Sequence, residues 1–270
     1  MPSMPPPVLA LLGHGRAAPW EPVEVGMSGA SVYRSSDGAV YAKCVGAADI
    51  GALRLERDKI EWLATTSIPG PRLVDWMVSE AGAALVISTV RGIPACDIPR
   101  ALVDRAAASM ARLLADLHAL PIDSCPFVRR LDRTVAEAAD AVRQGAVDIT
   151  DFDYSRLGRT AGDLLTELTQ RQLRAAELER DDLVVCHGDP CLPNLLIDPE
   201  TGDCTGLIDL GRLGVADRYL DLALTVRSMS ALEMNDQYDA RDAATFLNRY
   251  GISEPDPWRL DFYRLLDEFF

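Results

Sequence analysis

The sequence has no long hydrophobic run and no basic, signal-like start. Its longest uncharged apolar stretch covers residues 81–90, about half the length of a membrane-spanning helix. The six cysteines are scattered and include no Cys-x-x-Cys pair, which is typical of reduced thiols. These absences predict a cytoplasmic protein that has no membrane partner.

Basic charge is scarce. The chain has 27 basic against 41 acidic residues and a net charge of −14. A nucleic-acid binder needs a basic face, so no nucleic-acid partner is expected, whereas the acidic excess suits a cationic one. Lysine is scarcer still, because all basic residues except Lys43 and Lys59 are arginines.

Several familiar site patterns are missing as well. The chain has no Gly-x₄-Gly-Lys-Ser/Thr loop, which excludes a P-loop enzyme. Residues 8–18 fit a loose dinucleotide-binding pattern, but Pro19 interrupts the helix that should follow. Four residues could suggest zinc, yet their spacing matches no familiar ligand pattern: Cys186, His187, Cys191 and Cys204.

The first third of the chain has β-rich patterning. Residues 23–45 form short strand-like runs broken by glycine and an Asp-Gly turn, which indicates antiparallel hairpins. A helix is expected over about 51–65, with further strands over 72–79 and 84–90. Leu53, Glu56, Ile60 and Leu63 recur at helical spacing and should share one face.

The remainder is mainly helical in pattern. Its 270 residues and 48% hydrophobic content suit about two folding units with a sizeable core. Strands and helices do not alternate, so the expected class is α+β. The expected helices cover 101–120, 160–179, 215–229, 240–250 and 258–270, with a short hairpin at 195–197 and 205–208.

The most specific pattern joins Asp189, Asn194 and Asp209. Asp189 and Asn194 bracket an irregular loop, and Asp209 ends an apolar strand. Each alone is a common turn or strand-end residue. Together, two carboxylates and an amide oxygen suit Mg²⁺, and their order, Asp-x₄-Asn and then Asp-x-Gly, is that of phosphoryl-transferring kinases.

Lys43 and Glu56 supply the pattern of a nucleotide-binding half. Lys43 shares a strand face with Tyr41 and Val45, and an ammonium suits phosphate in a way that arginine does not. Glu56 falls on an apolar helix face and needs a partner, so a Lys43–Glu56 pair is expected. The alternatives are a solvent-facing edge-strand lysine and Glu61 as its partner.

These motifs resemble those of the aminoglycoside phosphotransferases, whose fold is similar to that of protein kinases. The resemblance is nearest to the 3′-phosphotransferase branch and spans residues 26–270. It rests on six segments: 26–28, 62–66, 187–194, 208–212, 211–223 and 265–270.

The resemblance implies a two-lobe protein-kinase-like fold. Residues 1–90 would form a β-rich nucleotide-binding lobe with one helix, 91–94 a hinge, and 95–270 a helical lobe with the catalytic loop and substrate site. ATP and Mg²⁺ are the implied cofactors. The resemblance implies catalysis for Asp189 and metal binding for Asn194 and Asp209. For the nucleotide phosphates, it implies anchoring by Lys43, which Glu56 steadies, and contact by Ser28. For the adenine base, it implies stacking by Tyr41 and backbone contact by Ser88 and Val90.

An aminoglycoside carries several ammonium groups, so carboxylates should line its site. The resemblance assigns the acceptor to Asp153, Arg212, Arg227, Asp267, Glu268 and the α-carboxylate of Phe270. A solvated acidic turn around Asp153 and a frayed terminus are the alternatives. After Arg227 the chain has Ser228 and Ala231 where the family carries acidic residues, and Glu233 is the nearest substitute.

The expected activity is ATP-dependent phosphorylation of an aminoglycoside, at the 3′-hydroxyl, conferring resistance to the drug. A monomer or weak dimer is expected. Another small-molecule kinase of this fold, acting on choline, a macrolide or a sugar, is the alternative. An inactive kinase-like binding module would be expected to lack Lys43, Asp189 or Asp209, and all three are present. An acidic scaffold without a site would show no stabilisation by nucleotide.

Overall fold

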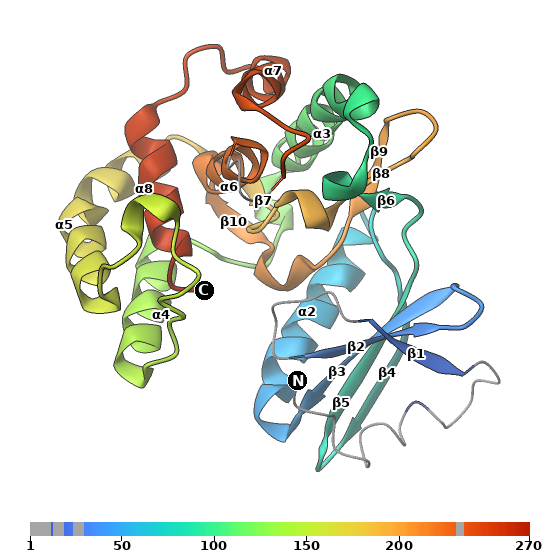
Figure 1. The fold of residues 1–270 in the computed structure, drawn as a ribbon. Helices are drawn as coiled ribbons and strands as arrows, with labels where there is room; N and C mark the ends of the chain where they lie inside the picture. The colour runs from blue at the N-terminus through green and yellow to red at the C-terminus, as the bar shows by residue number, and fades with distance from the viewer. Residues whose placement is uncertain (1–11, 13–18, 24–29, 231–234) are drawn as a thin grey trace. The chain divides into compact units, whose positions relative to one another are not determined.

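The computed structural model describes residues 12, 19–23, 30–230 and 235–270 (Figure 1). Ser28, Ala231 and Glu233 lie outside these residues. The chain forms two compact units: Met1–Arg91 with Thr205–Gly211, and Gly92–Cys204 with Arg212–Phe270. The segment Thr205–Gly211 thus packs with the first unit, although a division by sequence alone assigns it to the second.

The first unit is built on a five-stranded antiparallel sheet of order β1-β2-β3-β5-β4. Side chains alternate along each strand, so Val40, Ala42 and Cys44 enter a core on one face, and Tyr41 and Lys43 point to the other. The strands are β1 (Trp20–Val23), β2 (Ser31–Ser35), β3 (Val40–Gly46), β4 (Leu73–Ser79) and β5 (Gly82–Ser88).

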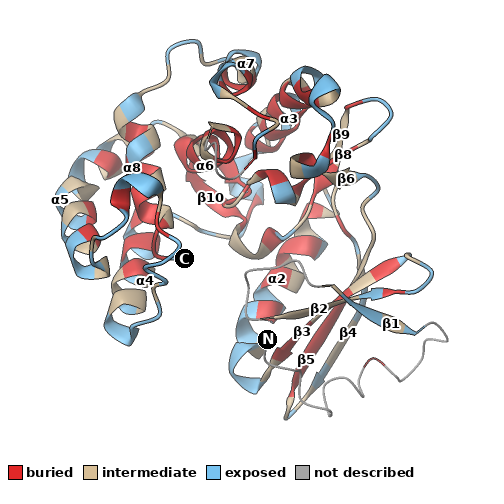
Figure 2. Cartoon of the chain, viewed as in Figure 1, coloured by how far each residue is buried: buried red, intermediate tan, exposed pale blue. Residues whose placement is uncertain are grey.

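Helix α2 (Ile50–Leu63) packs against this sheet. Its buried residues recur at helical spacing and form one stripe (Figure 2). The stripe combines three aliphatic residues with two charged ones: Leu53, Glu56, Lys59, Ile60 and Leu63. A charged pair on a buried stripe indicates partners on neighbouring segments.

The second unit is mainly helical, with α6 at its centre. Most residues of α6 (Arg218–Ser230) are buried, as Figure 2 shows, because α7 and α8 both pack on it. The other helices are α3 (Val103–His118), α4 (Leu131–Gln144), α5 (Ala161–Glu179), α7 (Ala240–Tyr250) and α8 (Pro257–Asp267).

Short strands frame the loops of this unit. β7 (Leu183–Cys186) pairs antiparallel with β10 (Gly214–Asp217), and β6 (Ile93–Pro94) pairs with β8 (Leu195–Ile197). β9 (Cys204–Leu207) leads from the second unit into the segment that joins the first.

The α+β class, with an antiparallel sheet and one packed helix before a mainly helical part, is confirmed. The helix expected over 215–229 is wrong at its start, because residues 214–217 form β10 and α6 begins at Arg218. Pairing with β7 outweighs the local helical pattern there. The structure also contains α4, which the sequence pattern had not indicated. In the described part of the chain, no helix is both long and apolar enough to cross a membrane.

Candidate active site

Lys43 lies at the centre of a charged cluster in the first unit. Its Nζ is 2.9 Å from Glu56 Oε2 and 3.2 Å from Asp209 Oδ1. Burial lowers the pKa of Lys43, but Glu56 and then Asp209 raise it by more, so its net pKa is above the ordinary value. The expected Lys43–Glu56 pair is therefore present, and the ammonium keeps its charge.

Glu56 is the buried carboxylate of α2, whereas Glu61 is exposed and lies 3.7 Å from Arg57. The helix face explains the difference. Glu56 lies on the stripe that packs against the sheet, and Glu61 lies off it. The preference for Glu56 as the partner of Lys43 is confirmed.

Asp209 reaches the same cluster from the segment after β9. Upstream of it, the Leu207 N–H donates to the Pro69 carbonyl at 3.1 Å, which fastens this segment to the first unit. Asp209 has φ 58°, the single positive φ of a non-glycine residue in the described ranges. That conformation costs about 1–2 kcal/mol for most L-residues, and a short polar side chain tolerates it best. The side chain keeps 44% of its surface exposed, so its carboxylate emerges rather than being lost in the core.

Tyr41, Ser88 and Val90, the residues assigned to the adenine base, all belong to the first unit. Tyr41 is half-buried on the Lys43 face of β3, with the Arg34 guanidinium 6.0 Å from its ring centroid. The Ser88 N–H already donates to the Arg72 carbonyl at 2.9 Å. The Ser88 N–H is therefore already paired within the first unit, and Val90 lies two residues further along the same segment.

The loop after β7 carries Asp189 and Asn194 in the second unit. Gly188 has φ 86°, and a Cβ there would lie 2.2 Å from the Arg212 carbonyl oxygen, so glycine is required. The buried His187 accepts the Asp189 N–H at Nδ1 (3.2 Å) and so braces the loop. Asn194 Nδ2 donates to the Asp189 carbonyl at 2.9 Å, which leaves its Oδ1 for another partner.

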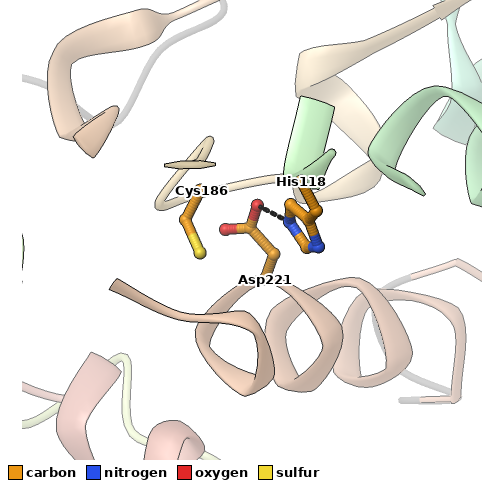
Figure 3. Close-up of side chains that lie close together, drawn as sticks. All are labelled: His118, Cys186 and Asp221. Carbon is orange, nitrogen blue, oxygen red and sulfur yellow. Dashed lines mark hydrogen bonds and ion pairs between the residues drawn. The ribbon is translucent and has the colours of Figure 1, made fainter. Parts of the chain in front are cut away.

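Asp221 of α6 anchors the start of this loop. Its fully buried carboxylate accepts the N–H groups of His187 at 2.7 Å and Gly188 at 2.8 Å. His118 Nε2 lies 2.9 Å from it (Figure 3). Cys186 Sγ is nearby too, and the three ligand-type atoms fall within 4.8 Å of one another. Because the Asp221 oxygens already accept these hydrogen bonds, the cluster serves as a loop anchor and not as a metal centre.

Two more residues of α6 hold the same loop. Thr225 Oγ1 donates to the Pro190 carbonyl at 3.1 Å, and the Leu192 N–H donates to Ser228 Oγ at 3.1 Å. Together with Asp221 these residues are spaced by four and three, so they line one helix face. Sequence reasoning missed this role, although polar residues at helical spacing in an otherwise apolar segment are its signal. Ser228 is thus a support of this loop.

Arginines pair with the carboxylates assigned to the acceptor. Asp267 lies 3.0 Å from Arg212 Nη1 and 2.7 Å from Arg227 Nη2. Arg212 Nη1 is also 3.9 Å from Asp189 Oδ2, and Arg227 Nη1 is 3.8 Å from Asp153 Oδ1. Burial lowers the pKa of Arg227, but Asp267 and the other carboxylates raise it by more. The two arginines therefore link Asp189, Asp153 and Asp267.

Glu268 is more enclosed than the sequence indicates. Its side chain is 2% exposed, its Oε2 accepts the Asp153 N–H at 3.1 Å, and Arg156 Nη1 lies 3.4 Å from its Oε1. Burial is the main reason that the pKa of Glu268 is raised to about 7. Arg156 also binds Asp261 Oδ1 at 2.6 Å. This arginine, which sequence reasoning missed, ties the acidic segment to α8 and its end.

Phe270 lies beside two of these cations. The guanidinium carbons of Arg129 and Arg212 are 5.0 and 5.5 Å from its ring centroid, within the range of cation–π attraction. The acceptor-side residues that the structure groups in the second unit are Asp153, Asp189, Arg212, Arg227, Asp267, Glu268 and Phe270.

An antiparallel sheet with a lysine–helix glutamate pair, followed by a helical part with the His-Gly-Asp loop, defines a protein-kinase-like phosphotransferase. The model of the phosphotransferase enzyme family named APH matches residues 20–263. The chain belongs to this family, as its motifs indicated.

Named relatives include two kinds of aminoglycoside kinase. A streptomycin 3″-kinase of Streptomyces griseus is 44% identical over 253 residues, covering 94% of this chain and 93% of the relative. An aminoglycoside 3′-phosphotransferase of Streptomyces fradiae is 41% identical over 260 residues, covering 93% and 95%. The resemblance to aminoglycoside phosphotransferases is thereby confirmed.

A solved structure agrees over the whole fold. The aminoglycoside phosphotransferase APH(3″)-Id of Streptomyces rimosus, in complex with ADP and streptomycin, superposes with a TM-score of 0.88 at 42% identity. The match covers 97% of this chain and 96% of that one. The two-lobe kinase-like fold expected from the motifs is confirmed.

Proposed function

We propose that this protein transfers the γ-phosphoryl group of ATP to a hydroxyl of an aminoglycoside and so confers resistance to that antibiotic. The observation that carries the proposal is the Lys43 ammonium held between Glu56 and Asp209, the arrangement that phosphoryl transferases use on a nucleotide. The matched relatives act on aminoglycosides by name, and one is named in complex with ADP and streptomycin.

The first unit would bind the nucleotide. Lys43, oriented by Glu56, would neutralise phosphate oxygens, and Ser28 would contact the phosphates. Tyr41 would stack on adenine, with the backbone of Ser88 and Val90 contacting the base edge. The division into a nucleotide lobe of residues 1–90, a hinge of 91–94 and a substrate lobe of 95–270 is part of the proposal.

Asp209 and Asn194 are the residues that would hold Mg²⁺. The donor set fits this ion, because the Asp209 carboxylate is exposed and the Asn194 amide oxygen remains available, and Mg²⁺ prefers such hard oxygen ligands. When bound, the ion would neutralise charge on the phosphate oxygens.

Asp189 would orient the acceptor hydroxyl and take its proton. The hydroxyl oxygen then forms a bond to the γ-phosphorus while the bond from that phosphorus to the β–γ bridging oxygen breaks, and ADP leaves. Asp189 is well placed for this because His187 and Asn194 fix its backbone on both sides. Since the transition state is loose, positioning should contribute more than base strength.

The second unit would bind the ammonium groups of the acceptor through the carboxylates of Asp153, Asp267, Glu268 and Phe270. Arg212 and Arg227 would hold Asp267 in position, and Arg227 also Asp153, which the distances above support. We propose the 3′-hydroxyl as the target, because the segment 211–223 resembles the 3′ branch. The 3″-hydroxyl of streptomycin is the second candidate, because the S. griseus streptomycin kinase is 44% identical.

The decisive experiment is a coupled ADP-release assay across acceptors, with the product position read by NMR. Kanamycin and neomycin should be phosphorylated, while tobramycin, which lacks the 3′-hydroxyl, should be poor. Turnover of streptomycin alone would instead establish the 3″ assignment. Turnover only of choline, a macrolide or a sugar would overturn the aminoglycoside proposal.

A matched variant separates chemistry from binding. Asp189→Asn should lower kcat by about 10²-fold or more, the usual contribution of a general base, and should leave the ADP dissociation constant unchanged. Retained turnover in this variant would contradict the role given to Asp189.

A further inference from the structure

Lys59 is the second of the two lysines in this chain, and the mechanism above does not use it. It lies on the buried stripe of α2, one turn after Glu56, and is only 5% exposed. A buried ammonium is costly unless it is paired. The buried Lys59 ammonium therefore needs a partner on a neighbouring segment.

The Lys59 ammonium is directed at the segment that carries Asp209. Its Nζ donates to the Gly211 carbonyl oxygen at 2.5 Å. Lys59 also acts on Glu56, whose pKa is raised by burial, and it lowers that pKa along with Lys43. Both lysines and the two carboxylates thus form one charge-balanced cluster within the first unit.

The turn from Asp209 to Gly211 needs support on both sides. Asp209 has a left-handed backbone at φ 58°, which persists only where the surroundings hold it. Before the turn, the Leu207 N–H is fastened to the Pro69 carbonyl at 3.1 Å. After it, the Gly211 carbonyl is fastened to Lys59 at 2.5 Å.

Gly211 itself faces the carboxylates of Asp209 and Glu56. A Cβ built on it would lie 3.7 Å from Asp209 Oδ1 and 3.8 Å from Glu56 Oε2. A shift of the Gly211 backbone would therefore move the Asp209 carboxylate relative to Lys43 and Glu56. The hydrogen bond from Lys59 opposes such a shift.

We propose that Lys59 is a positioning residue that holds the 209–211 turn and thereby sets the Asp209 carboxylate for the divalent cation. This inference rests on the proposed function, since it assigns Asp209 a metal ion. It distinguishes the two lysines, because Lys43 acts on the nucleotide phosphates and Lys59 acts through Asp209.

The test compares three variants of the full chain with wild type. Lys59→Met removes the ammonium and keeps the aliphatic stem, and Lys59→Arg restores a charged donor. Arg54→Met removes a positive charge from the exposed face of the same helix. ADP binding is measured by calorimetry without Mg²⁺, and thermal stabilisation by ADP is measured over a Mg²⁺ titration.

Lys59→Met should raise the Mg²⁺ concentration for half-maximal stabilisation by about tenfold, while metal-free ADP binding changes less than twofold. Lys59→Arg should recover most of the Mg²⁺ response, and Arg54→Met should match wild type. A merely structural lysine would lower the melting temperature without moving the Mg²⁺ midpoint, and that result would overturn the inference.

A further variant covers the case in which Lys59→Met does not fold. Lys59→Gln supplies a shorter, neutral donor, so its Mg²⁺ midpoint should rise about three- to fivefold, and an unchanged midpoint would overturn the inference. If wild type itself shows no Mg²⁺-dependent ADP binding, the proposed function fails. If wild type responds and the Lys59 variants match it, only the inference about Lys59 fails.

Discussion

At the scale of single residues, the first unit depends on one ammonium shared by two carboxylates. Lys43 lies within 3.2 Å of both Glu56 and Asp209, and the Glu56 side chain is 8% exposed. Removing one member of such a pair leaves an uncompensated buried charge, which costs more than the intact pair contributes.

We therefore expect Lys43→Met to lower the free energy of unfolding by up to about 3 kcal/mol and to weaken ADP binding. Adding Glu56→Gln should restore most of the stability, because the uncompensated buried charge is then removed. It should not restore ADP binding, because the double variant still has no ammonium to face the phosphates. Chemical unfolding and calorimetry of the single and double variants measure both effects. Wild-type ADP affinity in the double variant would contradict the assigned role of Lys43.

Glu268 gives a pH prediction with a defined sign. Its pKa is raised from 4.5 to about 7, first by burial and then by Asp153. The folded protein thus binds this proton more tightly than the unfolded chain. The Glu268 contribution to the free energy of unfolding is therefore present at low pH and is lost as the pH rises from about 4.5 to about 7.

Glu268→Gln stays neutral and should lack this loss. Its melting temperature minus that of wild type should become more positive between pH 5 and pH 8, in scanning fluorimetry or calorimetry, since the pKa shift applies to the wild type alone. Glu254→Gln, at an exposed position, is the control and should show no such trend. A constant difference for Glu268→Gln would rule out titration of this group in that window.

At the scale of secondary-structure elements, α6 supports the loop that follows β7. One face of this helix presents Asp221, Thr225 and Ser228 to successive backbone groups of residues 187–192. Regular pairing is interrupted in this stretch by Gly188, Pro190 and, just after it, Pro193. Its shape is therefore set by the helix beneath it.

Ser228→Ala should test this dependence. It leaves the buried Leu192 N–H without its acceptor, at a cost of about 1–3 kcal/mol, and should lower kcat by about tenfold while ADP affinity is kept. The control is Ser230→Ala on the same helix, whose hydroxyl donates to the Val226 carbonyl at 2.7 Å. If both variants retain wild-type kcat, the support from Ser228 is not needed for catalysis.

Most elements could be predicted because their patterns are local. The stripe Leu53–Leu63 predicted α2 and the inward position of Glu56, and both are observed. Residues 214–217 could not be assigned in this way. Val215 and Ala216 suit either structure, and only their pairing with Val185 and Val184 of β7 makes them a strand.

At the scale of the whole molecule, a segment from late in the sequence belongs to the first, N-terminal unit. Residues 205–211 pack with the N-terminal sheet and bring Asp209 there, while Asn194 belongs to the second unit. The proposal assigns these two residues to one Mg²⁺.

Asp209→Ala and Asn194→Ala should each abolish the Mg²⁺-dependent part of stabilisation by ADP, and the double variant should lose little more. Ligand at 100 times its dissociation constant stabilises the wild type by about 2.7 kcal/mol, which thermal unfolding resolves. Asp123→Ala, an exposed carboxylate in the second unit, should behave as wild type. Fully additive losses would show that the two residues do not share an ion.

The amino-acid sequence by itself determined the class of this protein. Three features can be recognised without coordinates, because each depends only on the spacing of residues along the chain. They are the order Asp189, Asn194 and Asp209, the isolated lysine of a strand and the inward glutamate of a helix. Only the tertiary structure decided which distant groups meet: Lys43 with Asp209 across 166 positions, Lys59 with Gly211 across 152 and Arg156 with Glu268 across 112. The physical reason is that such pairs depend on how separate segments pack, and no periodicity along the chain records that packing.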